Sequence, residues 1–328
     1  MSVVAMSDTA GSLGVEIGRA VAAGLDYAFA DREIITEAAE RFGQDARALT
    51  HIVEERPTLR EHFEVGTRRY AAFVEATILE MAARDDVVLV GRACPFVLGE
   101  APHTLRVRID APERLRAERI ARSPGITPQA ALDRVRESDR GRSARTKLLF
   151  HADWGDPLRY DLLLSTERLD VDDGARAVIQ ALAAERFRST EASRRTMTDR
   201  ALASQVHARL FANAVTRDRP LEVTCAGGVV TLAGAVDAAQ LWVTAEEVAA
   251  AIPGVAAVRN EITVIGVALD TRSEGDELSH AAFLHGEGRS WGGYGGEWYE
   301  REWDAVRRYR DARRGQAQES PEPARRTS

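Results

Sequence analysis

The segment 3-VVAMSDTAGSLGVEIGRAVAAGL-25 decides the fold class of this 328-residue chain, because an apolar run, a glycine-containing turn and a helical pattern follow one another directly. The run over residues 3–6 predicts a buried strand, and residues 14–25 predict a helix. A helix N-terminus that follows a strand is a common phosphate-binding place, since its unpaired N–H groups face the anion. The turn over residues 8–18 is therefore the first candidate binding site.

This turn lacks two residues that a phosphate loop usually carries. In the pattern G-x-x-x-x-G-K-[ST], the lysine neutralises the β and γ phosphates and the hydroxyl holds magnesium. With the strand ends superposed, Asp8 and Leu13 take the glycine positions, while Gly14 and Val15 take those of the lysine and the hydroxyl. Glu16 follows, so the turn carries two acids that repel a polyphosphate unless metal or arginines intervene. Taken alone, the turn favours an ordinary strand-to-helix connection.

Short apolar runs alternate with helical patterns up to about residue 184, which predicts an α/β fold with parallel strands joined by crossover helices. The predicted strands are 3–6, 27–30, 87–91, 105–109 and 160–165. The predicted helices are 14–25, 33–42, 64–83, 112–122, 127–142 and 172–184. The segment RSPGIT (122–127) predicts a short lid-like loop between two of them.

A second, smaller α+β unit is predicted after a charged stretch. It has a helix over 199–211, a hairpin with its turn at Gly227-Gly228, a helix over 238–251 and a strand over 258–266. The tail then loses periodicity, which predicts disorder. Its tryptophans, Trp291, Trp298 and Trp303, leave open a flexible tail or a segment that docks on a protein partner. The predicted divisions are 1–186, a linker over 187–197, 198–266 and the tail 267–328.

Composition excludes several classes of protein. The net charge is −7 and the pI is near 5.6, which argues against a nucleic-acid-binding surface. Cys94 and Cys225 lie far apart, and neither they nor the histidines show metal-ligand spacing, so no protein-held metal site is predicted. No signal peptide or membrane-length apolar stretch is present, and we expect a cytoplasmic protein.

Five stretches occur in the order and at about the spacing found in the cytidylate-kinase-like family, relatives of the nucleoside monophosphate kinases. They are GSLGVEI (11–17), DYAFADREIITEAAERFG (26–43), VVLVGRACPFVL (87–98), LRVRIDAPERLRAERI (105–120) and DWGDPLRYDLLLSTERL (153–169). The first resembles that family's own loop, G-S-G-G-R-E-I, but departs from it at Leu13 and Val15. The resemblance covers residues 3–184. It implies a P-loop-type five-stranded parallel sheet with flanking helices, ATP with Mg²⁺ over the first loop, and a pyrimidine monophosphate as acceptor.

The resemblance also assigns roles to single residues. Gly11, Ser12 and Gly14 would bind the donor phosphates. Asp31 and Arg32 would line the acceptor pocket, and Arg92 would bind the monophosphate. The lid arginines that would act on the transferring phosphate are Arg116, Arg119, Arg140 and Arg142. The alternative for Arg116 and Arg119, with Arg114 on the same helix, is a solvated face paired with Glu113 and Glu118. For Asp31 and Arg32 the alternative is helix capping and a surface ion pair. Ala93 stands where cytidylate kinases carry an acid.

Residues 198–266 resemble a BON domain, a small α+β module found in bacterial envelope and osmotic-stress proteins. The resemblance rests on GGVVTLAGAV (227–236) and IPGVAAVRNEITV (252–264). It implies binding of a phospholipid surface or a small ligand, and the alternative is a module that only packs or dimerises. The sequence thus leaves three functions open: a phosphotransferase acting on a nucleoside monophosphate, an inactive kinase-fold sensor of a nucleotide or anion coupled to the BON module, and a scaffold. Whether the chain is an enzyme stays open at this point.

Overall fold

The computed structural model describes residues 2–54, 65–91, 93–99, 101, 103–217 and 219–265, and only the backbone of residues 51–54, 65–68 and 70. Arg92 and the tail 267–328, with its predicted disorder and its candidate docking segment, lie outside the described residues. No helix in the described part of the chain is both long and apolar enough to cross a bilayer.

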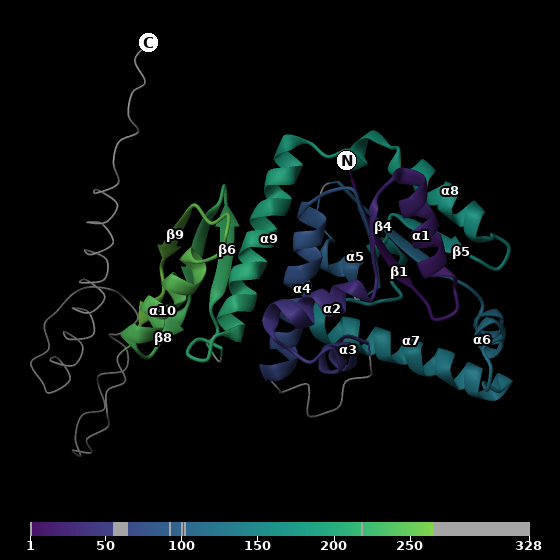
Figure 1. The fold of residues 1–328 in the computed structure, drawn as a ribbon, viewed down its shortest axis with the longest axis horizontal. Coiled ribbons are helices and arrows are strands. Elements are labelled where there is room, and N and C mark those ends of the chain that lie inside the picture. Colours follow the sequence, from purple (N-terminus) through teal and green to yellow (C-terminus); the bar gives the residue numbers. More distant parts are fainter. Residues whose placement is uncertain are drawn as a thin grey trace, which may run out of the picture.

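Five parallel strands form the central sheet, which confirms the predicted fold class. They are β1 (Val3–Asp8), β2 (Ala28–Ala30), β3 (Val87–Val90), β4 (Thr104–Asp110) and β5 (Leu162–Ser165), in the order β2-β3-β1-β4-β5 (Figure 1). The chain runs from β1 to one side for β2 and β3 and to the other side for β4 and β5. The loop after β1 therefore lies at a topological switch point, where ligands of open α/β sheets bind.

Helices cover both faces of this sheet. They are α1 (Gly14–Leu25), α2 (Glu33–Phe42), α3 (Ala46–Glu54), α4 (Val65–Ala83), α5 (Cys94–Val97), α6 (Glu113–Ala121), α7 (Pro128–Phe150) and α8 (Val171–Leu182). Five of them match the predicted ranges to within two residues at each end. The pattern did not predict α3 or α5, and α7 continues to Phe150 where it predicted an end at Arg142. Gly141 is buried and is accommodated within the helix, and the buried Arg145 and Thr146 anchor the added turns.

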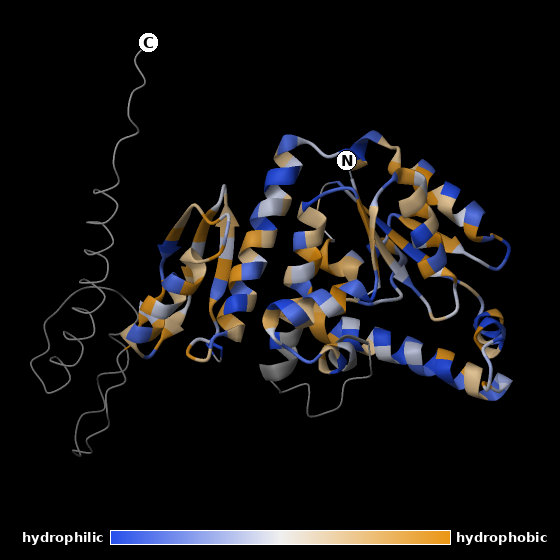
Figure 2. Ribbon diagram, in the orientation of Figure 1, coloured by the Kyte–Doolittle hydropathy of each residue, from blue (hydrophilic) through white to orange (hydrophobic). Residues whose placement is uncertain are grey.

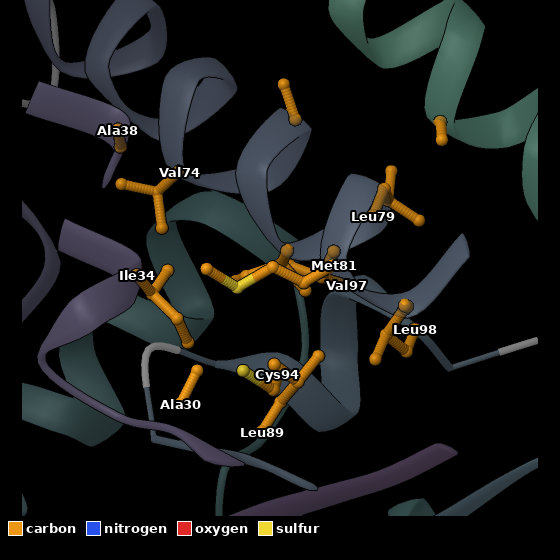
Figure 3. Packing of buried hydrophobic residues seen from close by; sticks show 14 of the residues in the cluster. Ala30, Ile34, Ala38, Val74, Leu79, Met81, Leu89, Cys94, Val97 and Leu98 are labelled. Carbon is orange, nitrogen blue, oxygen red and sulfur yellow. The ribbon is translucent and has the colours of Figure 1, made fainter. Parts of the chain in front are cut away.

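Alternate residues of β1 serve two cores, because successive strand side chains point to opposite faces. Val3 and Ala5 pack with apolar residues of α2, α4 and α5. Figure 3 shows this core around Ile34, Val74 and Cys94. Val4 and Met6 pack with α1 and α8 on the other face. In Figure 2 the apolar residues accordingly concentrate on the strands and on the helix faces turned toward them.

The second unit comprises one long helix, a small sheet and a shorter helix. Its elements are α9 (Glu191–Ala212), β6 (Glu222–Ala226), β7 (Val229–Ala233), β8 (Ala235–Val236), α10 (Ala239–Ala250), β9 (Ala257–Asn260) and β10 (Thr263–Val264). Strands β6 and β7 form the expected antiparallel hairpin, with Gly227 and Gly228 at φ 58° and 77° in its turn. The expected last strand is divided: β9 pairs with β7, and β10 pairs with β8.

Helix α9 belongs to both units. It begins at Glu191 with a capping box of Thr190 and Ser193, so the stretch 187–197 expected to be a linker overlaps its first turns. Met197, Ala201 and Ala208 are buried in the core of the first unit, beside α4. Leu202, Val206 and Leu210 are buried in the core of the second. Figure 1 shows α9 lying between α4 and β6, so the two units share this helix.

Asp199 on α9 holds the hairpin turn of the second unit. Its carboxylate accepts hydrogen bonds from the backbone N–H groups of Gly227 at 2.8 Å and Gly228 at 2.9 Å, and from the Cys225 thiol at 3.4 Å. Burial raises the pKa of Asp199, but these hydrogen bonds outweigh burial and hold the pKa below its usual value. Burial and the nearby carboxylate raise the pKa of Cys225 to about 11. The ionised form of Asp199 is therefore the one that stabilises the turn.

We expect Asp199→Asn to lower the free energy of unfolding at pH 7 by about 1–3 kcal/mol, because one charged acceptor of two backbone donors is lost. The folded pKa of Asp199 lies below the unfolded one, so the native protein loses this stabilisation as pH falls through the folded pKa. The difference between variant and native protein should therefore shrink toward pH 3. Urea unfolding followed by circular dichroism measures it, with Glu247→Gln at an exposed position as control. Equal stability at pH 7 would contradict the assigned role.

Candidate nucleotide site

The loop after β1 is tightly closed onto the elements around it. Gly11 has φ 82°, and a Cβ there would lie 2.7 Å from the backbone oxygen of Arg116. A Cβ on Gly14 would lie 2.2 Å from the Cβ of Asp8. Leu13, at φ 66°, adopts the left-handed conformation that a glycine would adopt without strain. The two glycines retained from the family's loop are therefore required sterically, and the substituted position keeps a glycine-like backbone.

Arg119 and Thr166 fix the carbonyl groups of this loop. Arg119 donates from Nη1 to the Gly11 oxygen at 3.1 Å and to Thr166 Oγ1 at 2.8 Å, and from Nη2 to the Thr166 oxygen at 2.7 Å. Thr166 Oγ1 donates to the Ser12 oxygen at 2.9 Å. Ser12 itself is fully buried. Sequence reasoning missed Thr166, although it directly follows β5 at the carboxyl edge of the sheet.

Asp8 is paired with an arginine of α7, which with α6 flanks the predicted lid loop (122–127); these two helices are called the lid helices below. Arg142 of α7 donates from Nη1 to Asp8 Oδ1 at 2.8 Å and also to the Asp8 backbone oxygen. Both side chains are largely buried. The acid at the first glycine position is therefore neutralised from across the site, by a residue 134 positions away in the chain.

Arg116 joins the two lid helices. It is buried and donates from Nε to the Ala111 oxygen at 2.9 Å and from Nη1 and Nη2 to the two oxygens of Asp139 at 3.0 and 2.7 Å. Such a two-pronged arginine–carboxylate pair is both strong and directional. In this structure the Arg116 guanidinium therefore clamps α6 onto α7.

Two hollows open on either side of the Asp8–Arg142 pair. The first, the loop hollow, lies over the turn after β1 and is lined by Asp8, Gly11, Leu13, Gly14, Val15, Glu16, Leu115, Arg119, Ile120, Arg122, Ser123, Thr166, Glu167, Arg168, Leu169 and Asp170. The second, the inner cleft, is lined by Ser7, Ala71, Val74, Glu75, Gly91, Ala93, Val97, Arg142, Arg145, Thr146, Leu149, Phe150 and Trp154. Asp8 lines one and Arg142 lines the other, so their ion pair lies where the two meet.

The inner cleft has fixed walls. Trp154 donates from Nε1 to Ser7 Oγ at 2.9 Å, and the Arg108 guanidinium carbon lies 4.2 Å from the centre of a Trp154 ring. Arg145 is buried and lies one helical turn beyond Arg142 on α7. Burial raises the pKa of Glu75 on α4, while Arg200 acts to lower it. The described lining of the cleft therefore combines two cations, Arg142 and Arg145, with the carboxyl group of Glu75, whose pKa is raised.

The loop hollow is electrostatically mixed. Burial lowers the pKa of Arg119, as does the neighbouring Arg122, while Glu16 raises it. Arg122 and Arg168 are exposed, so they can reach a ligand in the hollow. Among the described residues, no group of three or more His, Cys, Asp or Glu side chains is placed to hold a metal. Mg²⁺ commonly binds through substrate phosphates, water and one or two carboxylates. Glu16 fits that arrangement.

The other residues named from the sequence are dispersed. Asp31 is buried, and its Oδ1 would lie 3.9 Å from a Cβ placed on Gly91, so it is near the end of β3. Arg32 and Arg140 are exposed and line neither hollow. Arg92 lies outside the described residues, between two residues that line the inner cleft. The structure thus brings together Gly11, Gly14, Arg119 and Arg142, while Arg32 and Arg140 lie apart.

The fold is an open parallel α/β sheet with a glycine-containing loop between its first strand and first helix, a common architecture of phosphate-binding proteins. The chain belongs to the cytidylate kinase-like family, whose model matches residues 3–168, and a BON domain model matches residues 198–266. These matches confirm both resemblances.

The first domain is similar to curated cytidylate kinases. It is 32% identical over 158 residues to one from Methanopyrus kandleri, covering 46% of this chain and 76% of that protein. It is 33% identical over 108 residues to one from Pyrococcus furiosus, covering 33% of this chain and 55% of that protein. A crystal structure of an uncharacterized protein from Eubacterium ventriosum superposes with a TM-score of 0.45 at 17% identity, covering 56% of this chain and 100% of that one.

We expect Asp139→Asn to lower the free energy of unfolding by about 2 kcal/mol, because the buried Arg116 loses the carboxylate that it binds through two hydrogen bonds and keeps only Asp110, at 3.9 Å. Thermal and urea unfolding at neutral pH measure the loss. Glu137→Gln, an exposed carboxylate on the same helix, is the matched control and should change stability by less than about 0.5 kcal/mol. Equal effects of the two substitutions would show that the Arg116–Asp139 pair does not hold the lid helices together.

Proposed function

We propose that the first domain binds ATP with Mg²⁺ in the loop hollow and a pyrimidine nucleoside monophosphate in the inner cleft. The γ-phosphoryl group would pass from ATP to a phosphate oxygen of the acceptor, leaving ADP and a nucleoside diphosphate. The observation that carries this proposal is the ion pair between Asp8, which lines the loop hollow, and Arg142, which lines the inner cleft. Arg142 Nη1 lies 2.8 Å from Asp8 Oδ1. Membership of the cytidylate kinase-like family supports it.

Arg142, on one of the lid helices, would supply the positive charge that the loop lacks without its lysine. Phosphoryl transfer depends mostly on positioning and on stabilisation of charge. An arginine between the two hollows, at the point where the phosphoryl group would be transferred, can therefore replace the lysine that the loop lacks. Arg142 occupies that point, with Arg145 one turn away on the acceptor side. Guanidinium groups stay charged and fork onto phosphate oxygens. Arg119 serves in a different way, because its hydrogen bonds to Gly11 and Thr166 shape the loop.

A second candidate function is a kinase-fold sensor that binds a nucleotide or another anion without turnover. The observation that favours it is again at Asp8: Arg142 already has a carboxylate partner, so a phosphate must compete with Asp8 for it. In addition, Gly14 and Val15 occupy the positions at which a phosphate loop usually carries a lysine and a Ser or Thr hydroxyl. In this reading the BON domain would bind a phospholipid surface or a small ligand and report to the first domain. The resemblance to BON domains assigns no catalytic residue to this module, so it would only bind its ligand.

The deciding experiment is calorimetric titration with ATP–magnesium and, separately, with cytidine monophosphate, followed by a coupled phosphotransfer assay on the same sample. Binding of both with turnover supports the kinase. Binding without turnover supports the sensor, and no binding at millimolar concentration contradicts both. Arg92→Ala tests the monophosphate role that the family resemblance gives to that residue, and should weaken acceptor binding.

We expect Arg142→Met to reduce kcat by about 10²–10³-fold, because it removes the cation from the transfer point. Circular dichroism checks that the variant is folded, since Asp8 loses its partner. The matched control is Arg134→Met, at an exposed position on the same helix, and its kcat should stay within about twofold of the native value. A fully active Arg142→Met variant would exclude the proposed role of the lid arginine.

A further inference from the structure

An arginine from α9 reaches the wall of the inner cleft. Arg200 donates from Nη2 to the backbone oxygen of Val97 at 2.7 Å, across 103 residues of chain. Val97 is the last residue of α5, and its carbonyl is one of those that a helix leaves unpaired at its C-terminus. Val97 also lines the inner cleft, and Figure 3 shows its side chain beside Met81. Arg200 therefore holds one edge of the cleft from outside the first domain.

The same arginine acts on Glu75, which is the one carboxylate among the described residues that line the cleft. Glu75 makes no hydrogen bond or ion pair with another described residue, and Arg200 influences it electrostatically without a direct contact. Arg200 Nη1 is buried and has no hydrogen-bond partner among the described residues. A buried polar group that stays unpaired is costly, and such groups are frequent at binding sites. Arg200 Nη1 and the Glu75 carboxylate are thus a donor and an acceptor without hydrogen-bond partners among the described residues, and Glu75 lines the cleft.

The charges of the cleft suit a ligand with two different ends. Arg142 and Arg145 offer positive charge on the lining, and Glu75 offers a hydrogen-bond acceptor on the same lining. A nucleoside monophosphate has a matching arrangement, with an anionic phosphate at one end and hydroxyl or amino donors at the other. When a ligand donor of this kind loses its buried acceptor on the protein, binding of the ligand is typically weakened strongly.

Two consecutive residues of α9 each form hydrogen bonds with a different unit. Asp199 binds the hairpin turn at Gly227 and Gly228, and the next residue, Arg200, binds Val97 at the cleft. A change in the hairpin that moves Asp199 would therefore also move Arg200. This adjacency gives the second unit a short physical route to the acceptor side of the site.

We propose that Arg200 is a positioning residue of the acceptor cleft: it fixes the end of α5 and keeps the Glu75 carboxylate ready to accept a hydrogen bond from the acceptor nucleoside. This inference rests on the proposed function. It makes the acceptor site a joint product of the kinase-like domain and the helix that begins the BON unit.

The test separates acceptor binding from turnover in the full chain. Arg200→Met should raise the KM and Kd for cytidine monophosphate about tenfold, with kcat and the KM for ATP–magnesium changed less than about twofold. Arg200→Lys keeps the charge and should restore most of the affinity. Arg195→Met, at an exposed position on the same helix, is the matched control and should bind like the native protein.

A double variant tests the route through Glu75. Glu75→Gln should weaken acceptor binding, and adding Arg200→Met to it should cost less than about a further twofold, because the two residues act together. If Arg200→Met does not fold, Arg200→Gln replaces it, since glutamine removes the charge and keeps a donor. A tenfold loss from the arginine substitution in the Glu75→Gln background would overturn the role assigned to Glu75 and leave Arg200 acting through its hydrogen bond to Val97.

The remaining outcomes distinguish the inference from the proposed function. A folded Arg200→Met variant with native affinity for cytidine monophosphate overturns the inference and leaves the proposed function standing. A native protein that binds neither cytidine monophosphate nor ATP–magnesium at millimolar concentration overturns both.

Discussion

The ion pair between Asp8 and Arg142 is the interaction on which the rest of the candidate site depends. An aspartate at the start of an anion-binding loop would repel phosphate, and the pair neutralises it with a cation from the lid. The pair also sets the position of α7, because Arg142 lies in the middle of a 23-residue helix. Once α7 is placed, Arg145, Thr146 and Phe150 line the inner cleft, and Asp139 meets Arg116 on α6. Loop, lid and cleft thus share one electrostatic anchor.

Much of the fold could be predicted because its signals are local. The five parallel strands are short apolar runs, and most of the helices have amphipathic patterns with recognisable starts, such as Thr127-Pro128 at α7. The end of α7 could not be predicted in this way, because its last turns are stabilised by burial of Arg145 and Thr146, which is a tertiary effect. Helix α5 has only four residues and carries no periodic signal.

The candidate site was predictable only in part. Gly11, Gly14, Arg119 and Arg142 could be named from the family's motif, and the structure brings them together around the loop. Glu75 belongs to no motif, and Thr166 lies in the family-like stretch 153–169 without a role assigned to it. Only the packing of α4 and the position of the β5 edge bring these two residues to the hollows. Arg200 was less accessible still, since it lies in the second unit and reaches the site through a helix that the pattern began eight residues too late.

Helix α9 has a consequence for how such a chain can be inherited. Because its two faces complete two cores, a recombination event at residue 198 would divide a continuous helix, and a breakpoint at its start would leave α4 without Met197, Ala201 and Ala208 against it. Either domain could be exchanged for a homologue only if the incoming partner brought a helix with a compatible apolar stripe. A recombination product therefore keeps both cores only when the whole of α9 is inherited together with the elements packed on each of its faces.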